Sequence, residues 1–214
     1  MSRVVPMGDS CLSIVFEEKV DETVNAQCVR VAADLARRSL AGVRDIVPAF
    51  HTVSVYFDPR RIGRRELQAE IEREVAVHAD SPAYPSAPIE ITVSYGGEVG
   101  PDLAAVAEFA DCTEDEVIWR HTQTVYRVFM LGFLPGFAYL GPVDRRIAMP
   151  RLDTPRLRVA AGSVGIAGVQ TGIYPCDSPG GWRIVGRASI RLFDAGRAEP
   201  SLLKAGDRVK FVAI

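Results

Sequence analysis

Apolar residues recur with two different periods in the first part of the chain. Leu12, Ile14 and Phe16 stand at every second position, which predicts a short β-strand. Between residues 21 and 40, apolar residues recur every three or four positions opposite charged ones, which predicts an amphipathic helix. The same spacing predicts a second helix over residues 64–79.

Further strands are expected around these helices. Residues 44–47 and 52–58 predict a hairpin between the two helices, because apolar and polar residues alternate in the second segment. Residues 89–95 alternate in the same way and predict one more strand. The order strand, helix, two strands, helix and strand is that of a ferredoxin-like α+β sandwich.

A Pro-rich segment, SPAYPSAP at residues 81–88, separates these elements from the rest of the chain. Such a composition is typical of a linker. The strand at 89–95 follows it, so this strand can complete the first sheet or serve a second domain. We place the domain boundary inside the segment, with a small α+β domain at residues 1–84 and a second domain at residues 85–214.

The second domain is predicted to begin with two short helices. Pro101 suits the first position of one helix. Thr113 and Glu116 form a capping-box pattern that begins another helix, which runs to about Arg120.

Short strands dominate the remainder. They are expected at residues 125–131, 163–167, 172–174, 182–187, 190–193 and 208–214. Residues 131–186 hold 10 of the 18 glycines and 6 of the 14 prolines, so long helices are excluded there. Many short strands joined by Gly and Pro turns are typical of a closed β-barrel.

Composition and charge exclude several kinds of partner. The 25 basic and 27 acidic residues are spread along the chain and leave a net charge of -2, so neither nucleic acid nor an anionic membrane is expected as a partner. Apolar stretches are far shorter than the roughly 18 residues of a transmembrane helix, and the first residues lack the pattern of a secretory signal. We therefore expect a cytoplasmic protein.

The residues that often carry catalysis or bind metals are sparse. Cys11, Cys28, Cys112 and Cys176 are too far apart for a CxxC motif, and no metal site is expected. The sequence contains no GxxxxGK[ST] phosphate loop, no HExxH and no GxSxG, so catalysis by this chain alone is not favoured.

Of the three histidines, His51 and His78 are expected to be structural or solvated. His121 is the candidate for a functional role, because it lies directly before the first predicted barrel strand.

Two segments suit ligand binding. In GFLPGFAYLG, at residues 132–141, glycines let the backbone approach a ligand while aromatic rings wall it in; a packed barrel corner is the alternative. The residues of this motif that we single out are Gly132, Phe133, Pro135, Gly136, Phe137 and Tyr139. PRLDTPR, at residues 150–156, places Arg151 and Arg156 on a stiff loop that suits a carboxylate or phosphate, with surface ion pairing as the alternative.

Six motifs in order between residues 126 and 211 resemble one known family. They are GFLPGFAYLG, the paired PR of PRLDTPR, AGSVGIAG, QTGIYP, SPGGWRIVGR and GDRVKF. The chain thereby resembles the 5-oxoprolinase B subunits, also called kinase A inhibitor or allophanate hydrolase subunit 1, a family with a carboxyltransferase domain. The resemblance implies an α+β domain followed by a cyclophilin-like β-barrel.

The resemblance also implies partners and a reaction. A homologous barrel subunit, of the type of the 5-oxoprolinase C subunit or allophanate hydrolase subunit 2, and a third subunit are expected to join this chain. Together they would open the lactam of 5-oxoproline to glutamate with hydrolysis of ATP, which this chain need not bind itself. Polar residues of the motifs are then expected to line the barrel pocket and bind the amide substrate: His121, Arg156, Ser163, Gln170, Tyr174 and Ser178.

Two alternatives remain open at the level of sequence. Related domains form the carboxyltransferase part of urea carboxylase, so the substrate could be urea or allophanate. The chain could also be a regulatory inhibitor of a sensor histidine kinase. A peptidyl-prolyl isomerase activity is not favoured, because likeness of fold does not carry function.

Overall fold

A computed structural model describes residues 2–77 and 87–214 of the chain. The chain divides into two compact units, Met1–Pro85 and Ser86–Ile214. The boundary that we predicted between residues 84 and 85 lies outside the described residues, and so does His78. Each unit is therefore described by itself.

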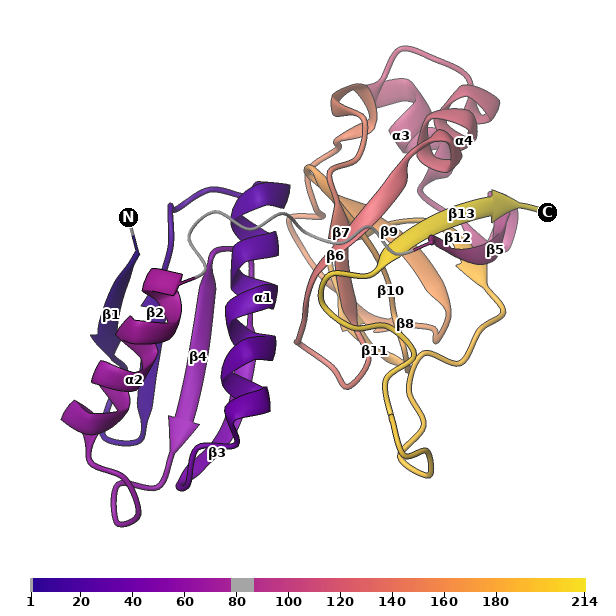
Figure 1. Ribbon diagram of the computed structural model, residues 1–214. Coiled ribbons are helices and arrows are strands. Elements are labelled where there is room, and N and C mark those ends of the chain that lie inside the picture. The colour runs from indigo at the N-terminus through magenta and orange to yellow at the C-terminus, as the bar shows by residue number, and fades with distance from the viewer. Residues whose placement is uncertain (1, 78–86) are drawn as a thin grey trace. The chain divides into compact units, whose positions relative to one another are not determined.

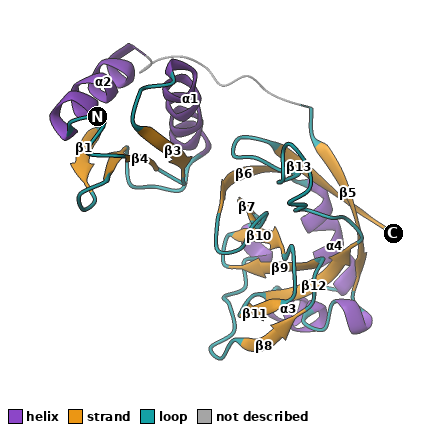
Figure 2. Cartoon of the chain, turned by 90° about the horizontal axis from the view of Figure 1, so that it is seen from below, coloured by secondary structure: helices purple, strands orange, loops and turns teal. Residues whose placement is uncertain are grey.

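The first unit is an antiparallel sheet with two helices (Figure 1). Its elements are β1 (Arg3–Pro6), β2 (Cys11–Val15), α1 (Glu22–Arg38), β3 (Val43–Pro48), β4 (Thr52–Phe57) and α2 (Arg64–Val77). The sheet order is β1-β2-β4-β3. Alternating residues of β2 and β4 share one core with residues of both helices, so both helices cover the same face of the sheet (Figure 2). The core includes Leu12, Ile14, Cys28, Leu35, Val53, Val55, Leu67 and Ile71.

The outer position of this sheet differs from the ferredoxin-like order. Strand β1, which the sequence pattern did not predict, pairs with β2 and lies where the strand at residues 89–95 would have completed the sheet. The two strands are adjacent in sequence, and the turn between them contains Gly8 with a φ of 75°. A short hairpin of this kind forms at little entropic cost. Strand β1 therefore occupies the sheet edge beside β2 in place of the more distant strand at residues 89–95.

Strand β5 (Ile89–Tyr95) belongs to the second unit, which is the other arrangement that the sequence left open. The second unit is a closed barrel of seven strands in the order β10-β7-β6-β13-β5-β12-β9, counted over the described residues. The other barrel strands are β6 (Val125–Leu131), β7 (Ala138–Gly141), β9 (Ser163–Ala167), β10 (Gln170–Ile173), β12 (Arg183–Ala188) and β13 (Arg208–Ala213).

Short helices and one two-stranded ribbon complete the second unit (Figure 1). They are η1 (Gly97–Val99), α3 (Leu103–Phe109), α4 (Glu114–Gln123), η2 (Arg145–Ile147), and the ribbon of β8 (Arg156–Val159) with β11 (Ser178–Gly180). No helix within residues 2–77 and 87–214 is long and apolar enough to cross a membrane. Buried residues of α3, α4 and the barrel strands form one core.

The predicted helix starts are only partly correct. Thr113 caps α4, since its Oγ1 accepts a hydrogen bond from the Glu116 N–H at 3.2 Å. The Glu116 carboxylate pairs with Arg120 instead, so only the hydrogen bond to Thr113 Oγ1 remains of the predicted capping box. Pro101 precedes the first helical turn of α3 instead of beginning it, because Asp102 is the N-cap residue. Asp102 makes no capping hydrogen bond, since its carboxylate has other partners.

The strands of the second unit were only partly predicted. Strands β6 and β9 have the predicted bounds, but β7, β8 and β11 were not predicted. Residues 190–193 are not a strand; Phe193 alone forms an isolated bridge, with Ser201. The chain turns directly after it, where the Asp194 carboxylate accepts from the Gly196 N–H at 3.0 Å, so no ladder can extend.

Candidate functional site

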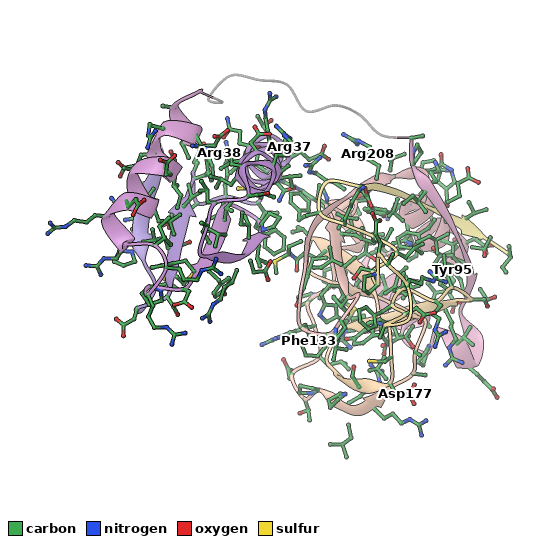
Figure 3. The ribbon with its side chains drawn as sticks, turned by 60° about the horizontal axis from the view of Figure 1, so that its bottom comes forward. Arg37, Arg38, Tyr95, Phe133, Asp177 and Arg208 are labelled. Carbon is green, nitrogen blue, oxygen red and sulfur yellow. The ribbon has the colours of Figure 1, made fainter. Side chains whose placement is uncertain are left out.

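His121 belongs to a buried hydrogen-bond chain inside the second unit. Its side chain is 0% exposed. Nδ1 lies 2.7 Å from the hydroxyl of Tyr95, which Figure 3 labels, and Nε2 lies 2.9 Å from Thr171 Oγ1. The Thr171 hydroxyl donates its one proton to the Gly165 carbonyl at 2.9 Å, so it accepts from Nε2–H. Nδ1 therefore accepts from the Tyr95 hydroxyl.

This environment makes His121 a neutral link between elements. Burial lowers the pKa of the imidazole to about 3. The ring also stacks on Phe211 with 4.7 Å between ring centroids. Both nitrogens are occupied within the protein, so the side chain connects α4 to β5 and β10 and offers no group to a ligand.

Arg156 is bound to a buried carboxylate. Its Nη2 donates to Asp102 Oδ1 at 2.7 Å, and Asp102 is 7% exposed. The second oxygen, Oδ2, accepts from the Ile184 N–H at 2.6 Å. Arg156 Nη1 donates to the Trp182 carbonyl at 3.3 Å. The pair thus ties β8 and the start of α3 to the segment that carries Trp182.

Arg156→Met is expected to lower the free energy of unfolding by about 1.5–3 kcal/mol, because it leaves the Asp102 carboxylate without its charged partner. Arg158→Met on the same strand is the matched control. Arg158 pairs with Asp177 at 2.6 Å on the surface, where an ion pair contributes little (Asp177 is labelled in Figure 3). Urea unfolding of both variants checks the difference, and equal losses would contradict it.

Arg156 and Ser163 line a polar pocket of about 310 Å³. Charged and polar side chains from several elements surround it, among them Glu98, Arg156, Arg158, Ser163 and Arg187. Two of its three guanidinium groups are balanced, because Arg156 pairs with Asp102 and Arg158 with Asp177, and Glu98 adds a negative charge to the lining. The polar pocket therefore has no strong excess of positive charge.

A second pocket, of about 330 Å³, has walls of aromatic rings, and we call it the aromatic pocket. The rings are those of Phe133, Phe137, Tyr139, Tyr174 and Trp182. Phe137 is central and 1% exposed. Each of the other four rings packs edge-on against it, with centroid distances of 5.0 Å to 5.7 Å. Such a cluster combines a large apolar surface with fixed geometry.

Phe133, which Figure 3 labels, lines the aromatic pocket and is largely exposed. It is 62% exposed and has a φ of 69°, a left-handed backbone conformation that L-residues rarely adopt. Strain of this kind persists where the surrounding structure imposes it and is frequent at functional sites. The neighbouring backbone is held by a bond from the Phe137 N–H to the Leu134 carbonyl at 3.0 Å.

Two glycines permit this arrangement. Gly136 has a φ of 82°, and a Cβ on it would lie 2.8 Å from Phe193 Cβ. A Cβ on Gly180 would lie 2.4 Å from the hydroxyl oxygen of Tyr174. The glycine motif is therefore both a tight corner of the barrel and a wall of the pocket, so the two interpretations of its sequence are compatible.

Arg151 is the charged residue that lines the aromatic pocket. It is exposed and forms no ion pair with another residue in the described ranges. Its backbone is held on both sides: Arg183 Nε donates to the Pro150 carbonyl at 3.1 Å, and the Leu152 N–H donates to the Gly181 carbonyl at 2.7 Å. The guanidinium is thus presented from a fixed loop beside the rings.

The aromatic pocket has no acid–base group with a pKa near neutrality. Its described lining includes no histidine, cysteine or carboxylate. Burial raises the pKa of Tyr139 and of Tyr174, so both phenols stay protonated. Across residues 2–77 and 87–214, no three His, Cys, Asp or Glu side chains are grouped so that they could hold a metal ion. The arrangement is that of a binding pocket.

The structure separates the residues that we predicted to line one pocket. Arg156 and Ser163 line the polar pocket, Tyr174 lines the aromatic pocket, and His121 lies inside the barrel. Three aromatic residues of the glycine motif, by contrast, share the aromatic pocket: Phe133, Phe137 and Tyr139.

The remaining predicted residues line neither pocket. Gln170 is half-buried at the start of β10, opposite Ala167. Ser178 Oγ donates to the adjacent Pro179 carbonyl at 3.2 Å. Arg151 was absent from the predicted set, although its loop had been recognised as one that presents guanidinium groups.

Comparison with known proteins gives consistent matches. The family model of the carboxyltransferase domain, subdomain C and D, matches residues 2–203. The 5-oxoprolinase B subunit of Bacillus subtilis (strain 168) is 39% identical over 99% of this chain and 92% of its own length.

Two solved structures are similar in fold. TTHA0988 has a TM-score of 0.84 at 36% identity; the match covers all of this chain and 40% of that longer chain. The urea carboxylase of Kluyveromyces lactis has a TM-score of 0.77 at 20% identity and is covered to 22%, which shows the fold alone.

Proposed function

Since the chain belongs to the family of 5-oxoprolinase B subunits, we propose that it is the corresponding component of an ATP-dependent 5-oxoprolinase. In this function the complex opens 5-oxoproline to glutamate, and the barrel, of the cyclophilin-like type, carries the substrate pocket. The observation that supports a role in binding is the aromatic pocket with Arg151 at its side.

The aromatic pocket suits a small cyclic amide. A ring of five atoms is small enough for a cavity of about 330 Å³, and its apolar methylene groups gain from contact with aromatic walls. The protonated hydroxyl of Tyr174 supplies a hydrogen-bond donor for an amide oxygen. These are groups that bind and orient a lactam without attacking it.

The chemical step is assigned to the assembled complex. The sequence has no phosphate loop, and the aromatic pocket is lined by no general base or nucleophile among the described residues. We therefore place the ATP site on one of the partner subunits. In the proposed reaction ATP transfers its terminal phosphoryl group to the lactam oxygen and leaves as ADP. Water adds to the activated ring carbon, and the ring C–N bond breaks, so that the nitrogen becomes the amino group of an open-chain acyl phosphate. A second water then hydrolyses the acyl phosphate to glutamate and phosphate. This chain forms one wall of a site shared with a homologous barrel subunit and a third subunit.

Reconstitution with each subunit omitted in turn tests this function. The chain is co-expressed with its candidate partners, and ATP hydrolysis and glutamate release are measured with and without 5-oxoproline. Activity is expected only when every subunit is present. A complex that assembles but does not respond to 5-oxoproline, or partners that are fully active without this chain, would overturn the proposal.

The same preparation separates the alternative functions. Urea and allophanate are offered as substrates in parallel, and turnover of either in place of 5-oxoproline would favour the urea branch. If the chain joins no partner subunit but lowers the autophosphorylation of a sensor histidine kinase, the regulatory function takes precedence.

A further inference from the structure

We propose that Arg151 recognises a carboxylate carried by the substrate ring, so that the aromatic pocket selects anionic cyclic amides over neutral ones. The identity of the ring rests on the proposed function. The selection by charge rests on the pocket itself.

The first argument is that Arg151 differs in its pairing from Arg156 and Arg158. Arg156 is neutralised by the buried Asp102, and Arg158 by Asp177. Arg151 has no carboxylate partner within the described part of the chain, and no carboxylate lines the aromatic pocket. Its positive charge is therefore available to a ligand that enters.

The second argument is that the loop is fixed before a ligand arrives. The two hydrogen bonds that flank Arg151, at Pro150 and Leu152, attach it to the segment that carries Trp182. Pro150 and Pro155 restrict the same loop further. Because the backbone of this loop is already fixed, less conformational entropy is lost when Arg151 binds a ligand.

The third argument is chemical complementarity. A guanidinium can bind a carboxylate through two parallel hydrogen bonds, and such bonds are about twice as strong as those between neutral groups. The apolar rings next to it contact the methylene groups of the ligand ring, and the Tyr174 hydroxyl donates to the amide oxygen. A five-membered lactam with a carboxylate on the ring carbon next to the amide nitrogen satisfies all three kinds of group, whereas a neutral lactam leaves Arg151 unused.

The test compares 5-oxoproline with 2-pyrrolidinone, which is the same lactam without the carboxylate. Binding to the full chain is followed by fluorescence of Trp182 in a Trp119→Phe background, since the chain contains two tryptophans. Arg151→Met is expected to weaken 5-oxoproline binding at least about tenfold, as expected for loss of a charge-assisted hydrogen bond, and to leave 2-pyrrolidinone within about twofold. Arg151→Lys is expected to retain part of the affinity.

Arg145→Met is the matched control, because Arg145 is exposed on η2 of the same unit and does not line the pocket. It should bind both probes like the parent. In the reconstituted complex, Arg151→Met is expected to raise the KM for 5-oxoproline by about the same factor as its binding constant, with kcat little changed.

Three outcomes overturn the proposal: equal weakening of both probes, no weakening of either, or no response of Trp182 together with an unchanged KM. Failure of the proposed function is a separate outcome. In that case no partner subunits restore 5-oxoproline-dependent ATP hydrolysis, while Arg151 still discriminates the two probes in the binding measurement.

Discussion

Replacing Phe137 by alanine is expected to lower the free energy of unfolding of the second unit by about 3–5 kcal/mol. Its ring is 1% exposed and packs edge-on against four others, so truncation removes the centre of the cluster and leaves a cavity. The rings around it cannot collapse freely, because Tyr174 is held against Gly180. Urea unfolding followed by Trp182 fluorescence, in the Trp119→Phe background, measures the loss.

Phe133→Ala is the matched control for this prediction. Phe133 lines the same pocket but is 62% exposed, so its truncation removes little buried surface, and we expect a change within about 1 kcal/mol. Similar losses for the two variants would show that the cluster is not organised around Phe137. A Phe137→Ala variant that is as stable as the parent would show the same.

The second large predicted effect is a loss of folding stability at acidic pH. The contribution of His121 to stability is expected to be fully present above pH 6.5 and to be lost progressively as the pH falls toward 3. The folded state holds the ring neutral, with a pKa of about 3, whereas the unfolded chain protonates it near the ordinary value of 6.5. Below pH 6.5 the unfolded state therefore binds more protons and is favoured. The loss reaches about 2 kcal/mol at pH 5 and about 4–5 kcal/mol over the whole range.

The comparison of parent and His121→Gln isolates this effect from that of the carboxylates. The variant cannot take up a proton at this position, so the difference in unfolding free energy between the two proteins should shrink as the pH falls from 7 to 4. Unfolding in urea at several pH values measures it. A difference that stays constant with pH would mean that His121 is not held neutral by its buried network.

The sequence predicted the helices and strands whose own residues carry a clear helical or alternating pattern. Strands β6 and β9 have the bounds that alternation indicated, and α1 and α2 lie within the predicted helices. It did not predict β1, because four residues with few alternating positions give little signal and the strand is defined by its pairing with β2. For the same reason β8 and β11, which pair with each other, could not be found in a segment dominated by turns.

The candidate site shows the same limit at the level of side chains. The loop with Arg151 and Arg156 was predicted to present guanidinium groups, and the predicted binding residue was Arg156. Its partner, Asp102, lies 54 residues away, and no local pattern indicates that the two meet. Three of the five rings of the aromatic pocket were predicted together, because Phe133, Phe137 and Tyr139 lie in one contiguous motif. His121 was predicted from its position in the chain, and only the fold shows that both ring nitrogens are used internally.

The pairing of β5 with β13 has a consequence for biosynthesis. These strands run parallel, with Ile89 beside Val209, so closure of the barrel joins segments about as far apart in sequence as the second unit allows. Contacts of such high sequence separation form slowly. On a ribosome, the barrel cannot close until its last strand has emerged. The first unit, whose elements end with α2, can fold well before that point.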